Sequence, residues 1–149
     1  TFTVVNTGSY AAIAPRVISG QVLTPAISLS DFANGTTKAP FAGVKLTLTD
    51  TGSTALAGNG GGEVAFCIAG NSPCIEMLPT NVGGSQANGT LSPGTQVATV
   101  LGNVPGVYEL CDLGVWDQAG NTQVLSSVAC GGTTDFSDYF PTTTITLSP

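Results

Sequence analysis

The sequence has no histidine and only three basic residues, Arg16, Lys38 and Lys45, in a chain of 149. A Ser-His-Asp or Cys-His catalytic arrangement cannot be built without histidine. A nucleic-acid-binding face needs several Lys or Arg residues together to neutralise phosphates, and three scattered cations do not supply it. The net charge of −6 also disfavours anionic membrane surfaces. We therefore expect no nucleic-acid partner and no histidine-dependent catalysis.

Charged residues of either sign are scarce as well. They make up 8% of the chain, whereas about 25% is typical of soluble domains. Hydrophobic residues reach 42%, which is enough for a packed core, and the length suits one domain. No apolar run approaches the roughly 18 residues of a membrane-spanning helix. We expect one globular domain without a membrane span, kept soluble by hydroxyl and amide groups and by attached glycans.

Four cysteines are present: Cys67, Cys74, Cys111 and Cys130. Their even number, the lack of histidine and the lack of a CxxC spacing favour disulfides over a zinc site. The predicted pairing is Cys67–Cys74 and Cys111–Cys130, because each pair flanks one predicted turn. Disulfides persist outside the reducing cytosol, and the chain begins at Thr1 without a methionine, as a processed mature protein would. We expect an extracellular or cell-surface protein.

Apolar and polar residues alternate with the two-residue period of β-strands, while helical periodicity is almost absent. In residues 43–50, Val44, Leu46 and Leu48 alternate with polar side chains. The same pattern predicts strands at 2–5, 17–23, 43–50, 63–68, 75–78, 96–101, 107–116, 122–128 and 143–147. The polar, glycine-rich residues 81–94 are expected to form one exposed loop. This spacing predicts an all-β, antiparallel two-sheet sandwich over residues 10–149, preceded by a strand-like segment at residues 1–9.

Residues 106–121 read G-V-Y-E-L-C-D-L-G-V-W-D-Q-A-G-N. The segment resembles the last hairpin of bacterial and archaeal immunoglobulin-like surface domains, in which a strand that opens G-x-Y-x-L runs into a D-x-A-G-N turn. One additional residue lies here between the two motifs, and it would turn the following side chains to the wrong face unless a β-bulge absorbs it. We expect a bulge near Asp112–Gly114, which would let four side chains face the core: Tyr108, Leu110, Leu113 and Val115.

A second segment, residues 39–48, reads A-P-F-A-G-V-K-L-T-L. It is similar to the P-L-A-G-V-x-V-x-L opening of prealbumin-like surface-stalk modules. Both families are β-sandwiches that serve as spacers, stalks and adhesins. The resemblance therefore implies an immunoglobulin-like sandwich without catalytic activity, and it transfers no functional residue to this chain.

Two groups of acidic and amide residues suggest a calcium site. Asp112, Asp117 and Asn121 are expected near one end of the last hairpin, and Asp135 and Asp138 form a D-x-x-D sequence in a loop. Calcium binds six to eight oxygen atoms, which carboxylates and loop carbonyls can supply. Asp and Asn also stabilise turns through their own side chains, which needs no metal. Both interpretations stay open at this point.

Two catalytic alternatives do not need histidine. Thr1 could act as an N-terminal nucleophile activated by its own amine, but such enzymes carry helical layers and a supporting lysine, for which this sequence shows no pattern. A pair of carboxylates could hydrolyse glycosides, yet most of the nine acidic residues fall in predicted turns or on outward strand positions. We expect no enzymatic activity, and calcium is the one candidate cofactor.

Glycans enter the interpretation in two ways. Asn34 and Asn88 each begin an N-x-Thr sequence in a predicted loop, so both are candidate N-glycosylation sites. Four aromatic residues could instead form a platform on which a sugar ring stacks, although in a sandwich of this size such residues also serve as core: Tyr10, Trp116, Tyr139 and Phe140.

The leading hypothesis concerns the segment Thr1–Val5, which reads as a strand and is followed by a flexible joint at residues 6–9. Such a strand can complete the sheet of a neighbouring copy, as in a pilus-like surface filament. Phe2 and Val4 would then share the inserted face, with Val5 as a third apolar contact. Three alternatives remain: the strand belongs to its own sandwich, the protein is a carbohydrate-binding or adhesin module that recognises a surface glycan or protein, or it is a passive stalk.

Overall fold

The computed structural model describes residues 13–34, 36–38, 43–49, 61–68, 73–78, 80–84, 88–92, 99–100, 104–117 and 120–149. This part of the chain is built almost wholly from strands: β1 Arg16–Val22, β2 Ala26–Ser28, β3 Phe32–Ala33, β4 Thr36–Thr37, β5 Val44–Thr49, β6 Gly61–Cys67, β7 Cys74–Met77, β8 Thr80–Gly84, β9 Asn88–Ser92, β10 Thr99–Val100, β11 Gly106–Trp116, β12 Thr122–Ser126 and β13 Thr144–Ser148. Three short 3-10 helices complete it: η1 Leu29–Asp31, η2 Val128–Cys130 and η3 Phe136–Asp138. The expected all-β class is confirmed.

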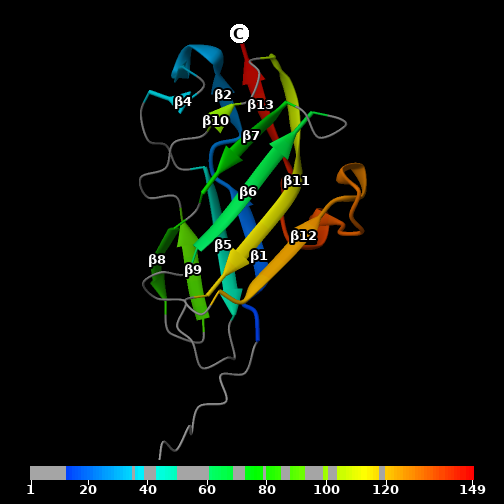
Figure 1. The fold of residues 1–149 in the computed structure, drawn as a ribbon. Helices are drawn as coiled ribbons and strands as arrows, with labels where there is room; N and C mark the ends of the chain where they lie inside the picture. The colour runs from blue at the N-terminus through cyan, green and yellow to red at the C-terminus, as the bar shows by residue number, and fades with distance from the viewer. Residues whose placement is uncertain are drawn as a thin grey trace, which may run out of the picture.

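The strands form two sheets (Figure 1). One has the order β1-β5-β9-β8, and the other runs β3-β4-β10-β7-β6-β11, with β12, β13 and β2 beyond β11. Between β8 and β6 the pairing consists of one residue pair, Gly61 with Thr80. One pair of strands, β13 and β2, is parallel, so the expectation of a wholly antiparallel sandwich is wrong. Parallel neighbours need a long connection, and these two strands come from opposite ends of the described chain.

The core lies between the two sheets and follows the alternation expected from the sequence. In β5, Val44, Leu46 and Leu48 are fully buried, while Lys45 between them is exposed. The facing sheet contributes the inward residues of β6, β7 and β11, which belong to the same cluster. Burying each such side chain stabilises the fold by about 1.5–3 kcal/mol.

The expected bulge is present in β11, one residue earlier than predicted. Leu110 pairs with Phe66 of β6, and the next pair is Asp112 with Ala65, so Cys111 is the additional residue. As expected, Tyr108 and Leu110 before the bulge and Leu113 and Val115 after it are all buried. Cys111 is buried as well, and its placement in the bulge aims it at the chain segment that follows β12.

Tyr108, in the first half of β11, is the largest of the fully buried side chains. A buried phenol needs a hydrogen-bond partner, and its hydroxyl donates to the carbonyl oxygen of Val104 at 2.7 Å. Burial raises the pKa of Tyr108, the effect of the hydrogen bond being smaller and opposite. The hydroxyl therefore keeps its proton, and its donor role, at neutral pH.

The expectation of one loop over residues 81–94 is wrong. β8 and β9 lie in this stretch and pair with each other, and β9 also pairs with β5. Strand pairing uses main-chain groups, so polar and glycine-rich residues can adopt it when a neighbouring strand is available. The predicted strand at 96–101 is described over Thr99–Val100, and β2, β3 and β4 were not predicted.

β12 and β13 lie one after the other along the same edge of β11 (Figure 1). β13 pairs with residues 106–109 of β11, and β12 pairs with residues 112–116. Between them the chain leaves the sheet for residues 127–143, here called the excursion. It starts where Ser127 N donates to Cys111 O at 2.8 Å, and it ends where Leu110 N donates to Thr143 O at 2.8 Å. The excursion therefore opens and closes at the bulge of β11.

Across the described ranges, no helix has the length and apolar character needed to span a membrane.

Candidate functional site

The five candidate calcium ligands lie at three separate places. Asp112 is opposite Ser126 in the body of the β11–β12 hairpin, four pairs away from the Trp116–Thr122 pair at its end. Asp117 therefore lies five residues, or about 16 Å of strand, beyond Asp112. The expectation that Asp112 joins Asp117 and Asn121 at one end of the hairpin is wrong, because strand length separates them. Asp135 and Asp138 lie in the excursion, and the described residues contain no group of three or more acidic or cysteine side chains placed to hold a metal ion.

Asp117 stabilises the turn that follows β11. Its carboxylate is buried and accepts two hydrogen bonds from Asn121, one from the backbone N–H at 2.9 Å and one from the side-chain amide at 2.8 Å. Gly120, with φ at +83°, donates its N–H to the Asp117 carbonyl at 3.1 Å. The expected turn at Asp117–Asn121 is confirmed, and both carboxylate oxygens serve it.

We expect Asp117→Ala to lower the free energy of unfolding by about 1–3 kcal/mol, because two amide groups of Asn121 lose a largely buried acceptor. Asp117→Asn is the matched control and should cost less, since it keeps one acceptor oxygen. Denaturant titration measures both. A chelator should leave the melting temperature of the wild-type protein unchanged. A drop of more than about 10 °C with chelator would instead reveal a bound ion that stabilises the native state.

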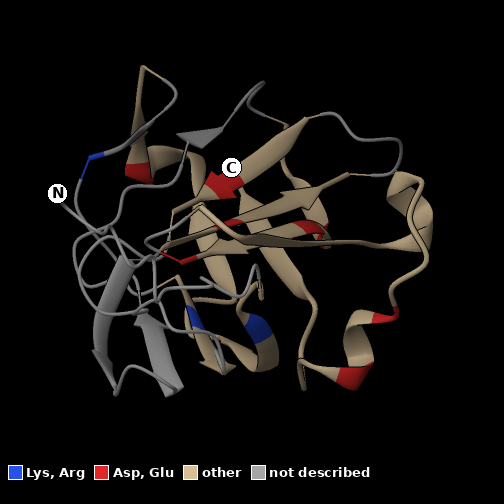
Figure 2. Ribbon diagram, turned by 60° about the horizontal axis from the view of Figure 1, so that its bottom comes forward, with Lys and Arg blue, Asp and Glu red and all other residues tan. Residues whose placement is uncertain are grey.

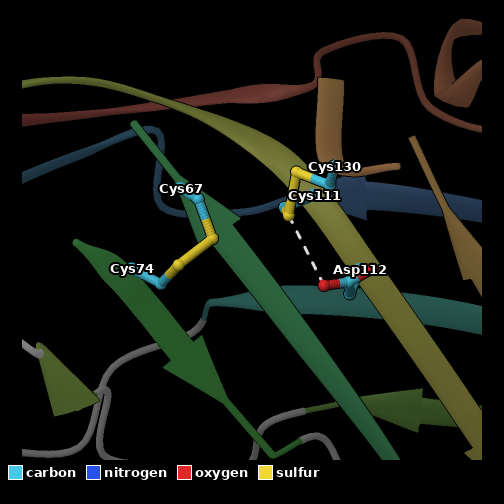
Figure 3. The surroundings of a disulfide bond; sticks show 5 residues. All are labelled: Cys67, Cys74, Cys111, Asp112 and Cys130. Carbon is cyan, nitrogen blue, oxygen red and sulfur yellow. Dashed lines mark hydrogen bonds between the residues drawn. A yellow bond between two sulfur atoms is a disulfide. The ribbon is translucent and has the colours of Figure 1, made fainter. Parts of the chain in front are cut away.

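The structure contains the two disulfides that the sequence favoured, Cys67–Cys74 and Cys111–Cys130. Cys67 and Cys74 are register partners on the neighbouring strands β6 and β7, and Figure 3 shows the second bridge on the adjacent β11. Asp112 Oδ2 lies 3.4 Å from the Cys111 sulfur. A disulfide sulfur has no proton to donate, so this is a contact between a carboxylate and a bonded sulfur. The negative charge of the Asp112 carboxylate opposes the approach of an attacking thiolate to this disulfide.

A hollow lies between the excursion and β11. It consists of two adjoining parts of about 300 and 240 Å³, which share Glu109, Leu110, Ser127 and Ala129 as lining residues. The larger part is otherwise lined mostly by polar side chains, and the smaller part mostly by apolar ones and Cys130. The Ser127 hydroxyl oxygen is buried and has no hydrogen-bond partner among the described residues. We call this feature the excursion hollow.

Asp135 is one of two carboxylates that line the excursion hollow, with Glu109. Its Oδ1 accepts hydrogen bonds from the side chain of Ser137 at 2.6 Å and from the Ser137 N–H at 3.0 Å, which lower the pKa of Asp135. The carboxylate therefore caps η3 in its ionised form, and the cap is lost only in acid, as the pH falls below the ordinary pKa of 3.8. A glycosidase acid needs a raised pKa, so Asp135 does not suit that role.

The aromatic candidates within the described residues do not gather into a sugar platform. Phe140 is buried and makes an edge-to-face contact with Phe136, with ring centroids 6.2 Å apart. It packs over Gly20 of β1, where a Cβ atom would overlap its ring. Trp116, the last residue of β11, covers Gly61 at the start of β6. Both rings pack against the backbone of neighbouring strands, and Tyr10 lies outside the described residues.

The two candidate glycosylation sites differ in their setting. Asn34 is exposed in the turn between β3 and β4, with a φ of 53° that Asn tolerates better than most residues. Asn88 is the first residue of β9, so its expected place in a loop is wrong. Asn34 keeps the accessibility that a transferase requires.

Charge does not mark a binding face on the part of the chain that the structure describes. Figure 2 shows the few charged residues distributed over several strands and the excursion. The main acidic feature is a shallow depression of about 330 Å³ on the outer face of β6 and β11, with Glu63, Glu76 and Asp112 among its lining residues. Small residues create it, since Ala65 lies between Glu76 and Asp112, and Gly114 lies opposite Glu63.

The outer edges of β1 and β12, which pair with no further strand among the described residues, lie near each other. On β1, the Val17 N–H donates to Gln123 Oε1 at 2.9 Å, and the Gly20 N–H donates to Tyr139 O at 3.0 Å. On β12, the one backbone hydrogen bond that the described residues make to the outer edge is Thr134 N to Ser126 O, at 2.9 Å. The β12 edge was not predicted as a site, although its sequence, T-Q-V-L-S, has no charge and no proline.

Comparisons with protein-family models, with curated proteins and with solved structures found no match. The geometry of this chain therefore carries the functional argument. The donor residues expected from the sequence, Phe2, Val4 and Val5, lie outside the described residues.

Proposed function

We propose that the protein is a non-enzymatic structural protein of the cell surface or extracellular space, a filament subunit that joins copies of itself by β-strand donation. The observation that carries this proposal is the uncharged β12 edge, whose outward main-chain groups are largely unused by the described residues. An edge of this kind is a template for another strand. The segment Thr1–Val5, with its alternating Phe2 and Val4, is the strand offered to it.

The extracellular location is supported by the two disulfides, which are stable in an oxidising compartment. An exposed sequon at Asn34 fits the same setting. We further propose an immunoglobulin-like plan for the sandwich. In its support, the G-x-Y-x-L segment is the start of β11, and the D-x-A-G-N segment spans the turn to β12.

The absence of catalysis is proposed from chemistry. The chain has no histidine, and in the excursion hollow Asp135 is held ionised by Ser137. General acid–base catalysis near neutral pH needs a group whose pKa lies close to that pH. The polar residues of this hollow favour hydrogen bonding to a ligand over proton transfer.

We expect Phe2→Asp to abolish assembly, because an unpaired charge entering an apolar contact costs several kcal/mol. Thr3→Asp is the matched control: it adds the same charge one residue away, on the opposite face of the predicted strand, and should assemble at least partly. Size-exclusion chromatography and electron microscopy of both variants beside the intact chain provide the measurement.

A different result would contradict strand donation. An intact protein that stays monomeric at high concentration, and that merely melts earlier after deletion of residues 1–9, would show that the segment belongs to its own sandwich. The excursion hollow, with its buried Ser127 hydroxyl, would then favour the second candidate function, an adhesin module that binds a surface glycan.

A further inference from the structure

We infer that the outer edge of β12 is the acceptor surface of this protein, and that the strand paired to it is the segment Thr1–Val5 of a second copy. The inference rests on the proposed strand donation and names its acceptor.

The hydrogen-bonding pattern of the β11–β12 ladder shows which main-chain groups of β12 do not bond to β11. Asn121 O accepts from Asp117 N at 3.1 Å, and Ser127 N donates to Cys111 O at 2.8 Å, so both ends of the hairpin ladder are fixed. In an antiparallel pair, alternate residues direct both main-chain groups towards the partner strand. Gln123 and Leu125 therefore bond to β11, and the three residues that face outward are Thr122, Val124 and Ser126.

The outward groups are nearly all unused. The carbonyl of Ser126 accepts from Thr134 N. Within the ranges that the structure describes, the N–H and C=O of Thr122 and Val124 and the N–H of Ser126 have no backbone partner. Two exposed valines accompany this edge, Val124 at 67% exposed and Val128 at 74%. Natural edge strands are usually protected by charge, proline or a bulge, and β12 has none of these.

The proposed donor matches the acceptor in character. Thr134 N already occupies the Ser126 carbonyl, so the edge left open by the described residues covers 122–125, and neither this edge nor the segment Thr1–Val5 has a charged side chain. Leu125 faces the interior next to this edge, is only partly buried and packs against the core. A strand added beside β12 with Phe2 and Val4 facing inward would cover Leu125. Thr3 and Val5 would then lie beside Val124, as lateral neighbours on the outer face.

The path of the chain allows donation to a second copy. Val17 N is bonded to the Gln123 side chain, so the chain enters β1 close to its own β12. Pro15 holds Ala14 in an extended conformation, and Figure 1 shows the described chain continuing past the end of β1, away from the sheets. Residues 6–15 could extend up to about 35 Å, a reach sufficient to contact a neighbouring molecule.

The first test detects the strand at its acceptor. ¹⁵N-labelled Phe2→Asp full-length protein, which offers an edge but a defective donor, is mixed with unlabelled wild-type protein. We expect the Val124 and Thr122 amides of the labelled chain to exchange with solvent at least about tenfold more slowly after mixing. The Leu125 amide, which bonds to β11, is the internal control and should not change. Quenched hydrogen exchange read by NMR measures all three, and protection here can arise only between molecules.

The second test changes the edge. Val124→Pro removes one outward N–H without removing a hydrogen bond to β11, and Val124→Lys adds the charge that protects natural edges. Both should abolish assembly. Val107→Lys is the matched control, because Val107 is 56% exposed but lies on β11, where its backbone pairs with Thr146. It should assemble normally. Circular dichroism and melting curves confirm that each variant is folded.

The outcomes separate this inference from the proposed function. Filaments that still form from Val124→Pro, with a rapidly exchanging Val124 amide, would overturn the acceptor and leave strand donation standing. A monomer whose Val124 amide is protected, and loses protection in Phe2→Asp alone, would keep the edge as the binding place of the segment but refute both pairing with a second copy and the filament. A monomer with an unprotected Val124 amide would refute both.

Discussion

Replacing Cys111 and Cys130 together by alanine is expected to lower the free energy of unfolding by about 3.3 kcal/mol, in proportion to the entropy of the chain loop that the bridge closes. The two residues are 19 apart in sequence. For a chain of this size the loss corresponds to a fall in melting temperature of roughly 7–13 °C. The bridge also ties η2 to the bulge of β11, so the excursion should become the first part of the molecule to exchange its amides.

The Cys67–Cys74 pair is the matched control. It closes a sequence separation of 7, and the same entropy model gives about 2.5 kcal/mol for its double alanine variant. Calorimetry of the two variants compares the losses directly, and peptide mapping of the unreduced protein checks the connectivity first. A Cys67–Cys111 peptide, or a larger loss at the shorter bridge, would contradict this account.

Gly20→Ala is expected to cost about 1–3 kcal/mol, although it adds a single methyl group. A Cβ atom at Gly20 would overlap the ring of Phe140. That ring is 2% exposed and is held against Phe136, so it cannot move away without disturbing the core. The backbone hydrogen bond from Gly20 N to Tyr139 O, at 3.0 Å, would be displaced with it.

Gly114→Ala provides the control for Gly20→Ala. Gly114 also lies in a strand, but its added Cβ would have no heavy atom closer than 4.0 Å, so a change within about 0.5 kcal/mol is expected. A smaller side chain in Phe140→Leu should recover part of the loss in the Gly20→Ala background. Denaturant titration of the double-mutant cycle measures this coupling. A Gly20→Ala variant as stable as the wild type would show that the ring relaxes freely.

Local periodicity explains why much of the fold could be predicted. Val44, Leu46 and Leu48 alternate with polar residues at the two-residue period of a strand, so they lie on one face of β5, and that face must be buried. The bulge in β11 followed from counting residues between two motifs, although its position differed by one residue. Such features depend on a few neighbours in the sequence.

Features that depend on distant neighbours were not predicted. Residues 81–94 look like a polar loop, but residues 80–84 and 88–92 form strands, because β5 offers main-chain partners to β9 and β9 offers them to β8. The pairing of both β12 and β13 with β11 could not be predicted either, because nothing in the sequence of residues 127–143 indicates that the two flanking strands lie along the same strand.

The parts of the candidate site also differ in how far the sequence could predict them. Its covalent and turn-forming parts, the cysteine pairs and the Asp117–Asn121 turn, could be predicted because short sequence separations determine them. The open edge of β12 could not, because an edge is defined by the strands that are not beside it. The grouping of Asp112 with Asp117 was wrong for a related reason: the two residues are close in sequence, but an extended strand separates them.

The two bridges also determine how the molecule would respond to tension. When the chain is pulled from its ends, force passes through the Cys67–Cys74 and Cys111–Cys130 bonds and bypasses the residues between them. The stretches of 7 and 19 residues are shielded, which shortens the fully extended chain by about 90 Å. The paired part of the β11–β12 hairpin, residues 112–116 and 122–126, lies inside the larger shielded stretch. The strand that we propose as the acceptor would therefore carry no load along its own backbone, even while the rest of the domain is being stretched.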